Sequence, residues 1–381
     1  MVAPGGGGGA SSWPSEGELD VVRQKVVEIS GRVAGEVRVV ACPYRICPLG
    51  AHVDHQGGTV TAMTINYGVL LGFVASDDAE ISLQSGQFEG VIRFRVDDLQ
   101  KPIENPENIN WESYARGAVY ALQNFGYDLK KGIIGYISGA KGLDSSGLSS
   151  SAAVGIAYLM ALENVNDLVV SPVDNIQLDK SIENKYLGLE NGILDPSAIL
   201  LSRYGYLTFM DCKGCNITYR RSVDIIREFL SAKRLPAVKM HQVFFVMCIL
   251  EENLARRAEH YFSETKRVVK GRDAWARGDL HEFGQLISAS GRSSILNYEC
   301  GSKEMIQLYE ILLKAPGVLG ARFSGAGFRG CCLAIVESGH AEEAAAFVRV
   351  EYEKAQPELV SKIQPDRRVL VCQPGDGARV I

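Results

Sequence analysis

Residues 139–153 form a loop rich in glycine and serine that has the groups needed to bind phosphate. The loop follows a predicted strand and leads into a predicted helix. Glycine lets backbone N–H groups approach an anion closely, and a helix N-terminus adds a partial positive charge. The hydroxyls of Ser149, Ser150 and Ser151 could also bind phosphate or a metal ion. The loop is neither a Walker A motif nor GxGxxG, and an ordinary capped helix is the commoner explanation of its composition alone.

A second segment, residues 42–58, concentrates polar side chains after an apolar strand. It contains Arg45, His52, Asp54 and His55. Such short polar groups bind hydroxyl-rich ligands, because carboxylates and imidazoles can pair with neighbouring hydroxyl groups. Taken alone, a polar turn with a salt bridge explains the segment equally well.

Two further segments carry candidate groups. Glu183 and Asp195 bracket a glycine-containing turn, and together they could supply a metal ligand and a general base. A carboxylate near a helix end is the commoner explanation of either residue alone. Residues 320–331 are rich in glycine and lie between two predicted strands, where a hairpin is the simplest interpretation.

The elements that position these segments follow from hydrophobic patterning. Apolar or alternating runs predict strands at 37–41, 67–75, 80–84, 91–96, 132–137, 205–209, 319–323, 331–336 and 369–372. Helical spacing of apolar residues predicts helices at 111–125, 148–162, 173–187, 223–230, 254–276, 304–313 and 341–352. Because strands and helices mix without regular βαβ alternation, the fold class is α+β.

Length and composition limit the class of protein. The chain has 381 residues, which predicts two lobes, and 40 basic against 45 acidic side chains give a net charge of −5, which does not favour nucleic acid as a partner. The longest apolar run, residues 243–250, is too short to cross a bilayer, so a membrane partner is not expected. Nine scattered cysteines, an odd number, favour a reducing, cytoplasmic location. Cys212 and Cys215 form a CxxC, but without a second pair nearby incidental thiols are favoured over zinc.

The four segments, taken together and in this order, resemble the motifs of the GHMP kinases, and within them the galactokinase branch. The family's substrate motif GRxNLIGEHTDYxGG aligns with residues 44–58, and its phosphate motif GLSSSAA is present unbroken at 147–153. Its GIMDQ stands as Gly-Ile-Leu-Asp-Pro at 192–196, and G(A/G)(R/K)xTGAGFGGC stands at 320–331 with two substitutions. Chance agreement at four ordered sites is improbable.

The resemblance implies a two-lobed α+β fold, with the active site between the lobes, and ATP-dependent phosphorylation of a sugar. Asp195 matches the carboxylate that takes the proton of the anomeric hydroxyl, and Arg45 matches the residue that keeps it ionised and steadies charge on the phosphate. Ser151, or its neighbour Ser150, and Glu183 match Mg²⁺ ligands.

The remaining matched positions fall into two groups. The positions that match sugar-binding residues are His52, Asp54, Ala51 and Gly192. The positions that match ATP-binding residues are Gly139, Lys141, Gly142, Ser145, Ser146, Gly147, Leu148, Ser149, Ser150, Ser151, Gly325 and Gly327.

Position 51 departs from the galactokinase pattern. Galactokinases carry a Glu there that binds the C6 end of the sugar, whereas this chain has Ala51. A Glu would repel a substrate carboxylate by about 4 kcal/mol at roughly 4 Å and an effective dielectric near 20, so its absence admits an acidic sugar. The chain is therefore similar to the galacturonokinases of this branch, plant kinases that phosphorylate the anomeric hydroxyl of D-galacturonate and feed UDP-galacturonate synthesis. Tyr44 and Arg329 are candidate partners for the C6 carboxylate, and looser sugar selectivity is the alternative.

A second departure concerns residues 212–258. Galactokinases have another strand, an HSL-like stretch and a Tyr-Asn-x-Arg stretch here, and no convincing copy is present. We therefore expect a C-terminal domain at 205–381 that is shortened around 212–258. It is expected to follow a disordered tail at 1–16 and an N-terminal domain at 17–204. The alternatives to a galacturonate kinase are a galactokinase for neutral galactose and a catalytically impaired sugar- or ATP-binding family member.

Overall fold

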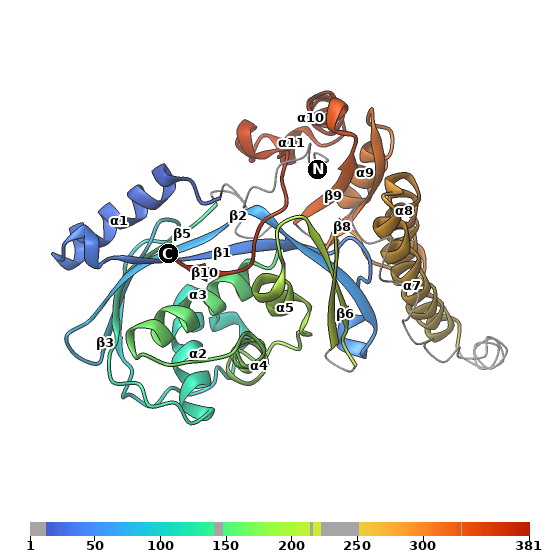
Figure 1. Ribbon diagram of the computed structural model, residues 1–381. Helices are drawn as coiled ribbons and strands as arrows, with labels where there is room; N and C mark the ends of the chain where they lie inside the picture. The colour runs from blue at the N-terminus through green and yellow to red at the C-terminus, as the bar shows by residue number, and fades with distance from the viewer. Residues whose placement is uncertain (1–12, 141–147, 214–215, 222–250, 329) are drawn as a thin grey trace. The chain divides into compact units, whose positions relative to one another are not determined.

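The computed structural model describes residues 13–140, 148–213, 216–221, 251–328 and 330–381. Two compact units are present (Figure 1). The N-terminal unit comprises residues 13–45, 63–204 and 374–381, and the C-terminal unit comprises residues 46–62 and 205–373. The predicted helix at 223–230 lies outside the described residues.

This division corrects the predicted boundaries 17–204 and 205–381 at two places. Residues 46–62 belong to the C-terminal unit, because the strand that begins at Thr59 pairs there with residues 208–211. Residues 374–381 return to the N-terminal unit, where Val380 pairs with Val40. In both places, strand pairing with a segment distant in sequence determines the unit to which the residues belong.

One sheet organises the N-terminal unit. Its strands run in the order β10-β1-β2-β5-β3-β4. The pairs β10–β1, β2–β5 and β3–β4 are antiparallel, and the pair β3–β5 is parallel. The strand bounds are β1 Arg38–Ile46, β2 Thr59–Ala75, β3 Glu80–Ser85, β4 Val91–Arg95, β5 Ile133–Gly139 and β10 Arg379–Val380. The mixture of strand directions confirms the α+β class.

Helix α1 (Glu16–Ser30) covers one face of this sheet (Figure 1). Its buried residues Leu19, Val22 and Val26 recur at helical spacing, and a capping box between Ser15 and Glu18 begins it. Trp13 is buried in the same core. The predicted disordered tail is therefore wrong for residues 13–16, because a cap and an aromatic anchor fix them.

The remaining helices of the unit lie on the opposite face (Figure 1). Their bounds are α2 Trp111–Asn124, α3 Ser150–Val165, α4 Pro172–Lys180, a π-helix Ser181–Tyr186 and α5 Leu194–Leu201, with 3₁₀ turns at Ala34–Glu36 and Pro106–Asn108. The predicted single helix at 173–187 is thus α4 followed by a π-helical turn. Such turns occur frequently at functional sites.

Glu163 of α3 is a buried carboxyl group outside the predicted site. Its Oε2 accepts a hydrogen bond from Asn175 Nδ2 at 3.1 Å, and burial raises its pKa to about 7. Because the folded-state pKa lies above the unfolded value, its contribution to stability is present below about pH 4.5 and is lost as the pH rises to about 7, roughly 3 kcal/mol in all. Glu163→Gln should remove this dependence in urea denaturation at about pH 5 and pH 8. An unchanged dependence would contradict the assignment.

The C-terminal unit contains a hairpin of β6 (Tyr206–Asp211) and β7 (Asn216–Arg221), and β6 also pairs with the start of β2. The sequence interpretation missed β7, because this segment carries none of the family's motifs. A second hairpin consists of β8 (Val318–Ser324) and β9 (Cys331–Val336). The helices are α7 Glu252–Arg277, α8 Leu280–Leu296, α9 Lys303–Leu312, α10 Ala341–Ala355 and α11 Pro357–Val360, with 3₁₀ turns at Asp54–Gln56, Ser338–His340 and Pro365–Arg367.

Apolar contacts around the second hairpin form a core of this unit. Met305 and Tyr309 of α9 pack with Ala321 and Phe323 of β8. The predicted strand at 369–372 is not observed, since those residues pair with no strand among the described residues. A short apolar run alone is weak evidence for a strand.

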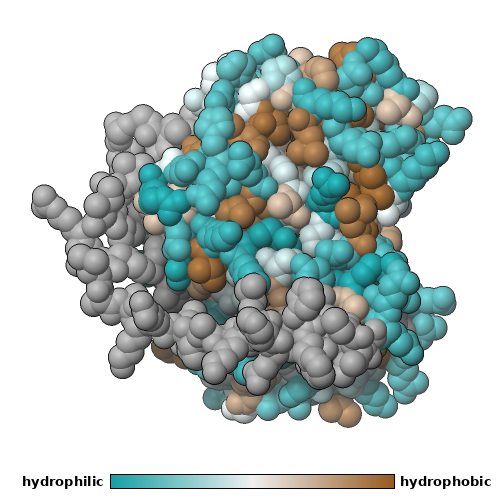
Figure 2. All heavy atoms as spheres, turned by 90° about the vertical axis from the view of Figure 1, so that its right-hand side faces the viewer, coloured by the Kyte–Doolittle hydropathy of each residue, from teal (hydrophilic) through white to brown (hydrophobic). Residues whose placement is uncertain are grey.

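The surface has no long apolar helix among the described residues. None of those helices is long and apolar enough to cross a membrane. On the face drawn in Figure 2, hydrophilic residues surround the apolar ones. Large exposed apolar side chains such as Leu254, Leu296 and Phe328 are ordinary features of a folded surface.

Candidate active site

Arg45 and Asp195 form an ion pair in the N-terminal unit. Arg45 lies near the end of β1 and Asp195 in the first turn of α5, and Arg45 Nε lies 2.7 Å from Asp195 Oδ1. The Arg45 side chain is 8% exposed and that of Asp195 is 24% exposed. An accessible carboxylate held by a guanidinium can accept a proton from a hydroxyl, and the same guanidinium can neutralise a nearby phosphate.

Glu183 lies in the π-helical turn close to this pair. Asn191 Nδ2 donates to its Oε2 at 3.0 Å, whereas its buried Oε1 has no hydrogen-bond partner among the described residues. Burial, followed by the negative charge of Asp195, raises the pKa of Glu183 to about 7, and the neighbouring Ser151 hydroxyl and Arg45 guanidinium oppose the rise. An unpartnered buried carboxylate oxygen beside a serine hydroxyl suits a hard cation.

Asp179 adds a second buried carboxyl group one helical turn before Glu183. Neither of its oxygens has a hydrogen-bond partner among the residues described, and Asp179 is 1% exposed. Burial, followed by the charges of Glu183 and Asp195, raises its pKa well above the usual range. The sequence interpretation missed this residue, because it belongs to none of the four motifs.

The structure describes no ready-made cage for a metal ion. Over the residues it covers, no three His, Cys, Asp or Glu side chains are placed to bind one ion. The predicted ligands Glu183 and Ser151 supply one carboxylate and one hydroxyl. Mg²⁺ is commonly held by one or two carboxylates together with substrate phosphates, so these residues fit it.

The phosphate loop is described at its two ends. Gly139 ends β5, and α3 begins at Ser150. Ser149 has a left-handed backbone conformation with φ of 62°, and its buried hydroxyl has no partner in the part of the chain that the structure describes. An unpartnered hydroxyl beside a helix N-terminus suits an anion. The predicted residues Lys141, Gly142, Ser145, Ser146 and Gly147 lie outside the described residues.

His52 and Asp54 lie together in the C-terminal unit. The His52 ring stacks on Tyr298 with centroids 4.6 Å apart, and its buried Nε2 has no partner within the described ranges. Burial, followed by the positive charge of Arg322, lowers the pKa of His52 to about 3, so the imidazole is neutral at physiological pH. The Asp54 carboxylate lies 3.6 Å from His55 Nδ1. The sequence interpretation missed Tyr298, which is 246 positions away from His52 in the chain.

The other predicted residues are placed as follows. Ala51 is buried directly before His52. Gly325 and Gly327 lie in the β8–β9 turn with positive φ angles of 85° and 78°. Gly192 lies three positions before Asp195. Arg329 lies outside the described residues.

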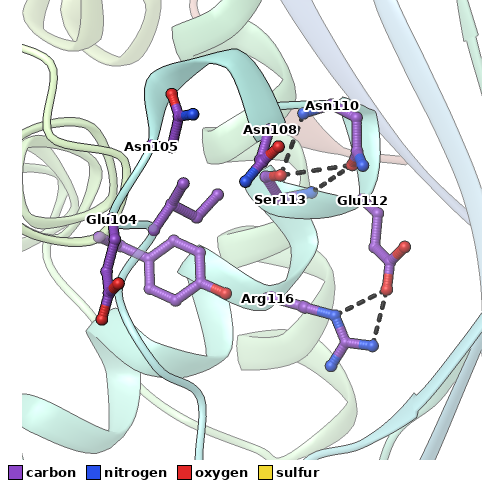
Figure 3. Close-up of a pocket in the computed structure, with 9 residues that line it drawn as sticks. Glu104, Asn105, Asn108, Asn110, Glu112, Ser113 and Arg116 are labelled. Atoms are coloured by element: carbon purple, nitrogen blue, oxygen red, sulfur yellow. Dashed lines mark hydrogen bonds and ion pairs between the residues drawn. The ribbon is translucent and has the colours of Figure 1, made fainter.

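A pocket of about 490 Å³ also opens in the N-terminal unit, at the start of α2 (Figure 3). It contains none of the predicted site residues. Asn110 and Ser113 in its wall cap the helix, and Arg116 pairs with Glu112. Its polar groups therefore serve local structure.

Comparison with known proteins identifies the family. Residues 113–203 match the GHMP kinase N-terminal domain, and residues 272–354 match the GHMP kinase C-terminal domain. The chain is 53% identical to the galacturonokinase of Arabidopsis thaliana, and the alignment covers 97% of this chain and 100% of that protein. The chain belongs to the GHMP kinase family. As a GHMP kinase it is a phosphotransferase with an alcohol acceptor, and ATP is its phosphate donor.

More distant GHMP kinases agree with this assignment. The galactokinase of Clostridium perfringens strain SM101 is 33% identical, with 79% of this chain and 86% of that protein covered. The crystal structure of Lactococcus lactis galactokinase complexed with galactose superposes with a TM-score of 0.79 at 27% identity, covering 95% of this chain and 99% of that one. The mevalonate kinase of Methanococcus jannaschii, with a TM-score of 0.59 at 17% identity, shares the fold over 90% of this chain and 96% of that one.

Proposed function

We propose that this GHMP kinase transfers the γ-phosphoryl group of ATP to the anomeric hydroxyl of D-galacturonate. The observation that supports this substrate most directly is Ala51, which lies next to the predicted sugar-binding residues His52 and Asp54. A glutamate at this position would repel an acidic sugar. The 53% identity to a galacturonokinase over its whole length supports the same substrate.

Asp195 and Arg45 carry the chemistry in this proposal. The anomeric oxygen attacks the γ-phosphorus, its proton passes to the Asp195 carboxylate, and the bond from the γ-phosphorus to the β–γ bridging oxygen breaks to release ADP. Arg45, 2.7 Å from Asp195, orients the carboxylate and neutralises charge on the transferred group. Positioning and charge neutralisation account for most of the catalysis in phosphoryl transfer.

The start of α3 would bind the phosphates through Ser149, Ser150, Ser151 and the backbone N–H groups of Leu148 and its neighbours. Glu183 and Ser151 would hold Mg²⁺, which neutralises phosphate charge when bound. Gly139, Gly325 and Gly327 are proposed to contact the nucleotide through their backbones. The nine scattered cysteines of the sequence, an odd number, support a reducing, cytoplasmic compartment.

The role of Glu183 leads to a prediction. Glu183→Gln should raise the Mg²⁺ concentration needed for half-maximal ADP formation by at least about 10-fold, since it removes a charged ligand. Mn²⁺ binding in the presence of a non-hydrolysable ATP analogue, followed by electron paramagnetic resonance, should weaken in parallel. Glu163→Gln, which changes another buried carboxyl group, is the control. Unaltered Mn²⁺ binding in Glu183→Gln would remove Glu183 from the metal site.

One observation favours the alternative of an impaired sugar- or ATP-binding protein. The alignment with the Arabidopsis galacturonokinase spans 422 residues, more than the 381 of this chain, so the relative has residues that this chain lacks. We propose that the shortening falls within 212–258, in the C-terminal domain. Retention of Arg45 and Asp195 as an ion pair argues for activity nonetheless.

ADP release by the purified protein with MgATP tests the function. Galacturonate, galactose and glucuronate are compared, with the Asp195→Asn protein as the blank. Turnover of galacturonate above the other two sugars is the expected result. Preferential turnover of galactose would instead identify a galactokinase, and sugar binding without turnover of any of the three would identify the impaired member.

A further inference from the structure

Buried side chains fix the backbone immediately before His52. Thr61 Oγ1 accepts from the Leu49 N–H at 3.0 Å and donates to the Leu49 carbonyl at 3.1 Å. The next residue, Gly50, donates its N–H to Glu264 Oε1 at 2.7 Å. The carbonyl of Ala51 lies 3.0 Å from His260 Nε2. Three successive residues of the sugar motif are thus held from outside the motif.

Glu264 is an ionised group inside the C-terminal unit. It is fully buried, Arg267 Nε lies 2.7 Å from its Oε2, and Arg322 lies 3.8 Å from its Oε1. Burial alone would raise its pKa, but Arg322, Arg267 and hydrogen bonds from Ser290 and Gly50 outweigh burial and hold the pKa below the usual range. A charged acceptor makes a stronger hydrogen bond to the Gly50 amide than a neutral one.

His260 lies one helical turn before Glu264 on α7, so both side chains project from the same face. It is fully buried, and burial lowers its pKa, so the ring is neutral. Its Nδ1 lies 3.0 Å from the Ser293 hydroxyl, which fits an Nδ1 that accepts and an Nε2–H that donates to the Ala51 carbonyl. One helix face thereby provides an acceptor for Gly50 and a donor for Ala51.

The loop has little freedom to move away from these contacts. Gly50 has a φ of 97°, and a Cβ atom there would lie 2.5 Å from Val60 Cα. His52, two residues on, has a left-handed φ of 62° and stacks on Tyr298. The direction of the His52 side chain therefore depends on the backbone path through Gly50 and Ala51.

We propose that Glu264 and His260 are positioning residues of the sugar site: together they clamp the Gly50–Ala51 backbone and set the placement of His52 and Asp54. This inference rests on the proposed sugar-binding role of His52 and Asp54. Neither residue contacts the reacting atoms. Misplacement of binding groups by about 1 Å costs on the order of 100-fold in rate, so a clamp of this kind has a measurable effect.

The test compares four variants of the full chain with the parent. Glu264→Gln keeps an acceptor oxygen but removes the charge. His260→Phe keeps an aromatic ring but removes the donor, whereas His260→Gln retains an N–H donor. Glu163→Gln, which alters a buried carboxyl group of the other unit, is the matched control. The readouts are KM for the sugar, KM for ATP, and hydrogen exchange of the peptide containing the Gly50 amide.

The clamp predicts a rise in sugar KM with KM for ATP within about twofold of the parent. The rise should be about 10- to 100-fold for Glu264→Gln and His260→Phe, as for other residues that orient ligand groups. His260→Gln should recover most of the affinity, Glu163→Gln should leave both constants unchanged, and exchange at Gly50 should accelerate in Glu264→Gln. Should Glu264→Gln fail to fold, the comparison of His260→Phe with His260→Gln tests the clamp.

Two results would overturn the clamp. One is an unchanged sugar KM in folded His260→Phe protein, and the other is an equal rise in both KM values. The sugar used is whichever of galacturonate and galactose the parent phosphorylates, so a parent that prefers galactose refutes the proposed substrate while the clamp is still tested. A parent that phosphorylates neither contradicts both proposals.

Discussion

Replacing Asp195 with Asn is expected to lower kcat by roughly 1,000-fold, within the range that general acid–base catalysis contributes. The amide has the size of the carboxylate but cannot accept the proton of the attacking hydroxyl. Because the phosphate-binding residues at the start of α3 are unchanged, the dissociation constant for ATP should stay within about twofold. Calorimetric titration of ATP and steady-state ADP release measure the two quantities.

Asp174→Asn is the matched control for this experiment. Asp174, like Asp195, lies in the first turn of a helix, and its backbone N–H bonds to the capping residue Ser171. We expect kcat of this variant to equal that of the parent. Retention of more than about a tenth of kcat in Asp195→Asn, or loss of its ATP binding, would show that the Asp195 carboxylate is not the proton acceptor.

Ala51→Glu should weaken galacturonate binding strongly and spare galactose. Two like charges about 4 Å apart repel by about 4 kcal/mol at an effective dielectric near 20, which corresponds to a rise in KM of up to roughly 1,000-fold. Water in the site can relieve part of this repulsion, so the figure is an upper bound. The KM for galactose should stay constant or fall.

Ala51→Gln separates charge from size. Ala51 is 6% exposed, so any larger side chain needs room, and Gln needs nearly as much as Glu. The uncharged variant should therefore show only the steric part of the effect. Equal losses of galacturonate affinity in the Glu and Gln variants would contradict the charge argument.

The sequence predicted the local elements well where hydrophobic pattern and motif agreed. The strand before the phosphate loop and the helix after it correspond to β5 and α3, because an apolar run and a Gly/Ser loop have few other arrangements. The pairing of Arg45 with Asp195 followed only from the family resemblance, since 150 positions separate the two residues.

The supporting residues could not be predicted in the same way. Glu264 is 214 positions away from Gly50 in the chain. In the sequence, Glu264 and Arg267 also have the i,i+3 spacing of an ordinary ion pair on an exposed helix surface. Asp179 lies within the helix predicted at 173–187, where a carboxylate has no distinguishing sequence signal. Burial alone distinguishes these residues, and burial is a property of the tertiary packing.

Two errors have a common physical origin. The stretch at 216–221 was not recognised as β7, and that at 369–372 was taken as a strand. In both places local β propensity is weak evidence, because a strand is defined by its partner. For β7 the partner is β6, whereas residues 369–372 have none among the described residues.

The position of the transferred phosphate tests the central claim most directly. The parent protein is incubated with MgATP and galacturonate, and the product is examined by proton and phosphorus NMR. We predict one phosphorylated sugar, in which the phosphorus couples to the anomeric proton and the C6 carboxylate is intact. A phosphate on any other hydroxyl, or the absence of a phosphorylated product from a protein that binds ATP, would contradict the assignment as a galacturonate 1-kinase.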